Sequence, residues 1–214
     1  CDRHGVLFIA DEVMCGMGRT GTLFAMEAQA VCPDLITVAK GLGAGYQPIA
    51  GMMASGRVVA AISAGSGVLA NGHTYMSHAV ACAGSLAVLR TIEQEDLLAN
   101  VRRRGTELRS ALDHRFGQHP HIGEVRGVGL FQALEVVADR GTKAPFPRSL
   151  RVAETLKQAA MDNGLICYPS AGAADGVSGD HVLLAPPYII DADQVGEIVD
   201  RLAASLAQVL PAAS

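Results

Sequence analysis

Two apolar runs that end in charged residues stand out near the start of the chain. Residues 6–10 lead directly into Asp11, and residues 35–39 lead directly into Lys40. A continuous apolar run of this length, without polar alternation, is typical of a parallel strand that is buried on both faces. Residues 49–54 are expected to form a third strand. This part of the chain therefore predicts a mainly parallel sheet with charged groups at the ends of its strands.

Helical periodicity replaces the strand pattern further along the chain. Residues 78–95, with small side chains along one side, and residues 97–116 are each predicted to form a helix. We expect this pair of helices to join two domains. The large domain would cover residues 1–97 and the small domain residues 98–214.

Strand-like and helix-like segments alternate in the small domain. Gly164 follows the last position of one predicted helix, where glycine commonly ends a helix in a left-handed conformation. The alternation predicts an α+β small domain and an α/β class for the whole chain. The predicted strands cover residues 122–126, 130–136, 165–168 and 181–185, and the helices cover residues 150–163 and 192–210.

Composition and charge narrow the class of protein. Hydrophobic residues make up 50% of the chain and charged residues 18%, and the formal net charge is −4. A weakly acidic chain of this kind is not expected to bind nucleic acid, and no apolar stretch is long enough to span a membrane. The five cysteines are scattered and indicate thiols in a reducing compartment, so we expect a cytoplasmic protein. His73, His78 and His181 lack metal-ligand spacing, and no metal is expected.

Lys40 and Asp11 together indicate a specific chemistry. Lysine is rarely buried without a partner, and desolvation makes its amine nucleophilic; a lysine stem that simply reaches into solvent is the alternative. Asp11 alone could be a turn residue. At one edge of a parallel sheet, the two residues match the needs of pyridoxal 5′-phosphate, which takes a lysine for its imine and a carboxylate that keeps its ring nitrogen protonated. Val13 would offer an apolar surface to one ring face, although ordinary core packing explains it equally well.

Residues 16–21 match the dinucleotide-binding pattern G-x-G-x-x-G, and Asp34 could serve as the acidic residue that follows it. In a dinucleotide site the first glycine comes directly after the strand and the third opens a helix. Here several residues separate the strand from the first glycine. The two acids at the strand end, Asp11 and Glu12, would also repel a pyrophosphate. The spacing therefore argues against a nicotinamide cofactor.

A polar segment, residues 71–75, precedes the helix predicted from residue 78. Hydroxyl and amide groups at a helix N-terminus bind phosphate well, so this segment could contact a phosphate. Ordinary N-capping by Thr74 or Ser77 is the alternative, and this stretch taken alone favours it.

Taken together, these segments resemble the class III (omega-type) aminotransferases, in order and in spacing. The similarity covers essentially the whole chain, because two further motifs carry it into the small domain. The matching segments are residues 7–13 (Leu-Phe-Ile-Ala-Asp-Glu-Val), 16–21, 33–34, 39–42 (Ala-Lys-Gly-Leu), 73–75 (His-Thr-Tyr), 126–130 (Arg-Gly-Val-Gly-Leu) and 185–187 (Ala-Pro-Pro).

The resemblance implies fold type I of the pyridoxal-phosphate enzymes and a homodimer with shared active sites. It places Lys40 on the family's Schiff-base lysine and Asp11 on the carboxylate that pairs with the pyridine nitrogen. Val13 corresponds to the residue that packs against the ring, and Thr74 to the threonine that binds the cofactor phosphate of the neighbouring subunit. The implied reaction is transamination between an amine or amino acid donor and a keto acid such as pyruvate.

Three positions depart from branches of the family. Met14 stands where some branches carry glutamine near the cofactor's 3′-oxygen, and this resembles the amine–pyruvate branch. Leu183 stands where the ornithine and 4-aminobutyrate branches have an arginine, and Tyr168 where amine–pyruvate enzymes often carry a mobile arginine. The family's carboxylate clamp is therefore not visible, and the amino donor stays open.

Family members are considerably longer, and this chain starts just before the aspartate-bearing strand. We therefore expect a C-terminal fragment with a partial large domain. By itself it would expose sheet edge and apolar surface, so it is not expected to catalyse the reaction alone. Two alternatives to transamination stay open. The same fold and cofactor could serve an aminomutase or decarboxylase, or the chain could be a truncated product that is inert or only an oligomerisation partner.

Overall fold

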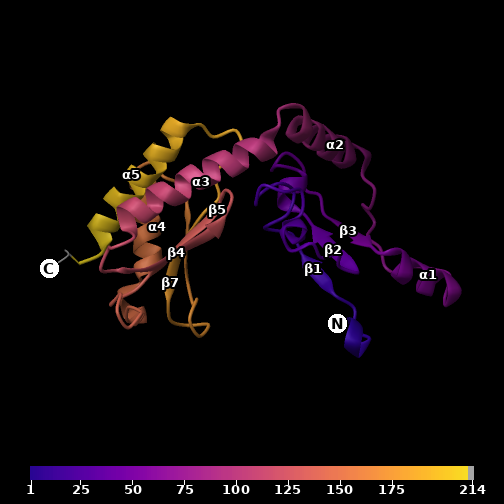
Figure 1. Ribbon diagram of the computed structural model, residues 1–214, viewed down its shortest axis with the longest axis horizontal. Coiled ribbons are helices and arrows are strands. Elements are labelled where there is room, and N and C mark those ends of the chain that lie inside the picture. Colours follow the sequence, from indigo (N-terminus) through magenta and orange to yellow (C-terminus); the bar gives the residue numbers. More distant parts are fainter. Residues whose placement is uncertain (212–214) are drawn as a thin grey trace. The chain divides into compact units, whose positions relative to one another are not determined.

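The computed structural model of the chain describes residues 1–211. The chain divides into two compact units, Cys1–Ala99 and Asn100–Ser214 (Figure 1). The boundary falls inside helix α3 (Leu97–Phe116), and each unit contains one β-sheet. The assignment of these units to a large cofactor-binding domain and a small domain stays a prediction.

A three-stranded sheet in the order β1-β2-β3 lies in the first unit. β1 (Ile9–Asp11) and β2 (Leu35–Val38) are parallel, as predicted, whereas β3 (Gly51–Ala54) is antiparallel to β2. The sheet is therefore mixed rather than mainly parallel. A parallel crossover usually needs an α-helix, and the segment between β2 and β3 contains only the short 3₁₀ helix Lys40–Leu42.

Much of this sheet is open to solvent within the part of the chain that the structure describes. Ile9 is 58% exposed and Met52 is 52% exposed, whereas Ala10 and Val38 are buried. The expectation of strands buried on both faces is therefore wrong for this chain taken alone, because no second layer of described residues covers the outer side chains.

Two helices complete the first unit. The sequence pattern did not predict α1 (Gly56–Ala64), and this helix contains no buried residue. α2 (Ala79–Gln94) matches the predicted helix and buries Ala81, Ser85 and Ile92.

The second unit is an α+β domain, as predicted. Its four-stranded antiparallel sheet has the order β4-β5-β7-β6, and three helices contribute to one hydrophobic core with the sheet (Figure 1). Leu108, Leu156, Leu202 and Val182 are at most 1% exposed in this core. Besides α3, the elements are β4 (Ile122–Val128), β5 (Phe131–Val136), α4 (Val152–Asp162), β6 (Tyr168–Ala171), β7 (Asp180–Leu184) and α5 (Ala192–Val209).

The end of α4 shows why β6 begins later than predicted. Gly164 has a φ of 75° and its N–H bonds to the carbonyl oxygen of Met161 (3.0 Å), as expected of a C-terminal glycine. The N–H of Leu165 bonds back to the carbonyl oxygen of Ala160 (2.8 Å). Because Leu165 is tied to the helix, the strand starts at Tyr168.

Gly127 generates a stability prediction. It has a φ of 146°, and a Cβ placed there would lie 2.2 Å from the carbonyl oxygen of Phe131. We predict that Gly127→Ala lowers the free energy of unfolding by about 2–4 kcal/mol, because both the backbone conformation and the clash oppose a side chain. Urea unfolding followed by circular dichroism measures this change.

Gly196→Ala, within α5, is the matched control. A Cβ there meets no atom within 4 Å, so the variant should be more stable by roughly 0.5–1 kcal/mol. Equal effects of the two substitutions would contradict this account of Gly127.

Candidate active site

Asp11 is the last residue of β1, and the parallel register places it opposite Thr37 of β2. The Thr37 hydroxyl donates a hydrogen bond to Asp11 Oδ1 (3.1 Å), and the backbone N–H of Val13 donates to the same oxygen (3.1 Å). Both bonds hold the carboxylate through one oxygen, so it can present the other to a cationic group. The sequence pattern alone did not identify Thr37, because it lies within an apolar run and reads as a strand residue.

Glu12, the next residue, is turned into the interior and is 1% exposed. Its carboxylate accepts hydrogen bonds from the backbone N–H groups of Ala25 (2.7 Å) and Met26 (2.9 Å). These groups begin the 3₁₀ helix Ala25–Gln29, whose first N–H groups need acceptors from outside the helix. The N–H of Glu12 also donates to the carbonyl oxygen of Thr37 (2.9 Å). Glu12 is therefore a structural anchor, a role that the sequence pattern did not indicate.

Lys40 follows β2 and opens the 3₁₀ helix Lys40–Leu42. Its φ of 42° lies in the left-handed region, and its side chain is exposed among the described residues. Such a conformation costs a residue other than glycine about 1–3 kcal/mol. Seven other non-glycine residues of the described chain also have a positive φ, so the conformation alone does not identify a site. Because β1 and β2 are parallel neighbours, Asp11 and Lys40 both lie at the carboxyl-end edge of the sheet.

The glycine-rich segment 16–21 does not open a helix, which a dinucleotide site would require. The N–H of Gly18 bonds to the carbonyl oxygen of Leu23 (3.2 Å), and that of Gly21 to the carbonyl oxygen of Gly18 (2.9 Å). The segment is a series of turns, which agrees with the rejection of a nicotinamide site.

Asp34 has a structural role instead of contacting a ribose. Its two carboxylate oxygens accept hydrogen bonds from the guanidinium of Arg57, each at 2.5 Å, and Oδ2 also accepts one from the backbone N–H of Phe8 (2.9 Å). The Arg57 guanidinium, and then the Phe8 N–H, lower the pKa of this carboxyl below its ordinary value. Asp34 thereby joins α1 to the start of β1.

Cys15 lies close to the two acids at the end of β1, and its thiol donates to the carbonyl oxygen of Asp11 (3.7 Å). Burial raises the pKa of this thiol, and the negative charge of Glu12 raises it further. The thiol is therefore protonated near neutral pH and is a poor nucleophile. All five cysteines are free.

Thr74 lies in an exposed turn ahead of α2. Nδ1 of His78 accepts a hydrogen bond from the backbone N–H of Ala81 (3.3 Å), so the helix is capped by His78 and not by Thr74 or Ser77. Histidine is not among the usual N-cap residues, which is why the sequence did not predict it. Thr74 stays a candidate ligand of a phosphate.

The two positions at which the family resemblance suggests an arginine in some branches lie side by side in the second unit. Tyr168 of β6 and Leu183 of β7 are register partners, so their side chains share one face of the sheet. Arg126 of β4 forms ion pairs with Glu124 (3.3 Å) and Glu135 (2.5 Å), so its charge is compensated.

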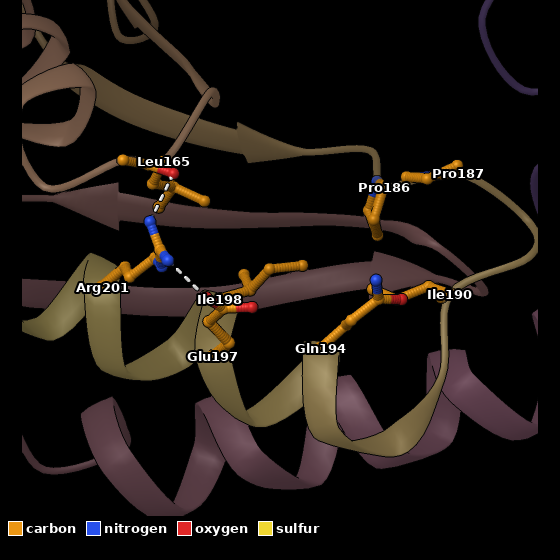
Figure 2. Close-up of a pocket in the computed structure, with 9 residues that line it drawn as sticks. Leu165, Pro186, Pro187, Ile190, Gln194, Glu197, Ile198 and Arg201 are labelled. Carbon is orange, nitrogen blue, oxygen red and sulfur yellow. Dashed lines mark hydrogen bonds and ion pairs between the residues drawn. The ribbon is translucent and has the colours of Figure 1, made fainter.

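A pocket of about 270 Å³ lies beside α5 in the second unit, and Leu165 and the two prolines of the Ala-Pro-Pro motif, Pro186 and Pro187, are among the residues that line it (Figure 2). Arg201 lines it, but its guanidinium donates to the carbonyl oxygens of Asn163 (3.0 Å) and Gly164 (2.8 Å) and pairs with Glu197. These interactions occupy the guanidinium at the end of α4. Arg201 therefore offers the pocket no uncompensated positive charge.

Within residues 1–211, no cluster of three or more His, Cys, Asp and Glu side chains could hold a metal ion. None of the helices in the same range is both long and apolar enough to cross a membrane.

The residues at the sheet edge are compatible with pyridoxal 5′-phosphate. Lys40 offers an amine and Asp11 a carboxylate, from neighbouring parallel strands, and the carboxylate is already fixed by two donors. Val13 is joined to Asp11 through its N–H and is half-buried. Thr74 is exposed on a separate turn ahead of α2.

Comparison with known sequences agrees with the family resemblance that the motifs indicate. The family described as Aminotransferase class-III matches residues 1–206. The aminotransferase YodT of Bacillus subtilis is 41% identical over 98% of this chain and 47% of its own length. The diaminobutyrate–2-oxoglutarate transaminase of Halomonas elongata is 40% identical over 93% of this chain and 42% of its own. The chain thus spans less than half the length of these relatives.

Solved structures agree with the sequence comparison. A transaminase from the marine bacterium Virgibacillus is 35% identical, with a TM-score of 0.91 over 98% of this chain and 46% of that one. The omega transaminase from Pseudomonas jessenii in complex with PMP is 37% identical, with a TM-score of 0.87 over 98% of this chain and 45% of that one.

The Asp34–Arg57 pair generates a pH prediction. The folded-state pKa of Asp34 is lowered, so the pair's stabilisation is fully present above the unfolded-state pKa of about 3.9 and is lost as the pH falls through the lower folded-state value. We predict that the gap in unfolding midpoint between the unmodified protein and Asp34→Asn narrows as the pH falls below about 4. Thermal unfolding at several pH values measures it. Glu93→Gln, at an exposed acid of α2 in the same unit, is the control and should show no such pH-dependent difference. A difference in midpoint between the unmodified protein and Asp34→Asn that widens in acid would contradict this prediction.

Proposed function

Because this chain belongs to the class III aminotransferases and has the fold type I architecture of pyridoxal-phosphate enzymes, we propose that the protein transfers an amino group from an amine or amino acid donor to a keto acid such as pyruvate. The cofactor would be pyridoxal 5′-phosphate. One observation carries the proposal: the parallel register that sets Asp11 opposite Thr37 brings Asp11 and Lys40 to the same sheet edge.

Lys40 would hold the cofactor covalently through its Nζ. When bound, the cofactor supplies an electron sink for the electron pair left as the donor's Cα–H bond breaks. Once the donor's amine has replaced it, the free Nζ of Lys40 would take the proton from Cα and return it on the acceptor side.

Asp11 would hold the ring nitrogen in its protonated form through charge and a hydrogen bond. Val13, fixed by its N–H bond to Asp11, would pack against one face of the ring. The carboxylate partner of the ring nitrogen would thus come from the last residue of β1.

We further propose a cytoplasmic homodimer, in which Thr74 binds the cofactor phosphate of the neighbouring subunit. Every residue from 63 to 80 is exposed in the described chain, including Leu69 (59%), Tyr75 (83%) and Met76 (58%). Apolar residues in such numbers favour a partner surface.

The five free thiols support a reducing compartment. The open sheet of the first unit supports the proposal that the 214-residue chain alone is not catalytically competent.

Reductive trapping tests the role of Lys40. Borohydride treatment of the intact protein with pyridoxal 5′-phosphate should fix the cofactor to Lys40, as found by peptide mass spectrometry. Lys40→Arg should abolish the attachment, whereas Lys157→Arg, an exposed lysine of α4, should leave it unchanged. Attachment to Lys143 or Lys157 would overturn the assignment.

A product assay tests the reaction type. With an amine donor and pyruvate, the intact protein should form alanine, and Lys40→Arg should lower the rate by about 10²–10⁴-fold, the usual contribution of a general acid–base group. Consumption of the donor without alanine would instead indicate decarboxylase or aminomutase chemistry on the same fold.

A further inference from the structure

We propose that Thr37 is a positioning residue: its hydroxyl fixes the carboxylate of Asp11 in the orientation that the cofactor's ring nitrogen needs. This inference rests on the proposed function, because it assigns Thr37 a part in holding the same cofactor. It goes beyond that function by adding a residue of β2, the strand that leads to Lys40.

The direction of the hydrogen bond is fixed by chemistry. An ionised carboxylate can only accept, so Thr37 Oγ1 is the donor to Asp11 Oδ1 at 3.1 Å. The second donor to Oδ1 is the backbone N–H of Val13, also at 3.1 Å. Two donors to one oxygen restrain the carboxylate more than one donor does, because a single hydrogen bond leaves rotation about it free. The second oxygen is then presented in a constant direction.

The position and the side chain of Thr37 both suit it to restrain the carboxylate of Asp11. It is directly opposite Asp11 in the parallel pair, so both backbones are part of one ladder. Its β-branched side chain has restricted χ1 rotation, so the hydroxyl is oriented before any ligand arrives. Its carbonyl oxygen accepts the N–H of Glu12 (2.9 Å), which ties the residue after Asp11 to the same strand.

The position of Asp11 makes this support necessary. The side chain is exposed among the described residues, and an exposed aspartate without fixed partners samples several rotamers. Glu12 cannot restrain it, since its own carboxylate is occupied by the N–H groups of Ala25 and Met26. Thr37 supplies the side-chain restraint, and it links the orientation of Asp11 to the strand that ends at Lys40.

The test compares Thr37→Val, which keeps the shape but removes the donor, with Thr37→Ser, which keeps the donor. Crystal structures of the cofactor-free intact protein give the orientation of the Asp11 carboxylate. Titration with pyridoxal 5′-phosphate, followed by absorbance, gives the affinity. We expect the carboxylate to turn in Thr37→Val and cofactor binding to weaken about tenfold, as loss of a hydrogen bond to a charged group would cause, with both restored in Thr37→Ser.

The circular dichroism spectra of both variants should match that of the unmodified protein, which separates positioning from a general loss of structure. Thr37→Ala replaces the valine variant if that variant does not fold. An unmoved carboxylate in the variants without a hydroxyl, or undiminished cofactor affinity in them, overturns the role of Thr37. If the unmodified protein itself binds no cofactor, the proposed function fails instead, and the orientation of Asp11 in the cofactor-free structures still decides whether Thr37 positions it.

Discussion

The parallel pairing of β1 with β2 is the constraint on which the candidate site depends. Neither Asp11 nor Lys40 is informative alone, since one simply ends a short strand and the other follows the next strand along the chain. Pairing brings the two strand ends to one edge, and the Thr37 hydroxyl and carbonyl oxygen reinforce the pair just where the strands end. The buried carboxylate of Glu12 then anchors the chain that leaves β1 to the helix starting at Ala25. The site is thus a property of hydrogen-bonded backbone rather than of a deep hydrophobic core.

Those parts of the fold that depend on local pattern could be predicted from the sequence. Apolar runs ending in Asp11 and Lys40 indicated the parallel pair, and the glycine at position 164 indicated the end of α4. The α+β character of the second unit followed from the same periodicities. Each of these features depends on residues close together in the chain, so a single sequence is enough to recognise it.

Other features depend on partners that the sequence does not reveal. β3 turned back against β2 because no helix intervened to carry it across the sheet. α1 has no buried stripe that periodicity could detect, and its clearest contact is the long-range pair between Arg57 and Asp34. The same applies to Thr37 and Glu12, whose roles follow from strand register and from backbone donors distant in sequence. Residue type could suggest the chemistry of the site, but not the residues that hold it in place.

The backbone at Lys40 has a consequence for stability. A left-handed φ is most easily adopted by glycine or asparagine, because other side chains crowd the following carbonyl oxygen. Glycine at this position would relieve the strain of the backbone, but it would also remove the amine that the proposed chemistry requires.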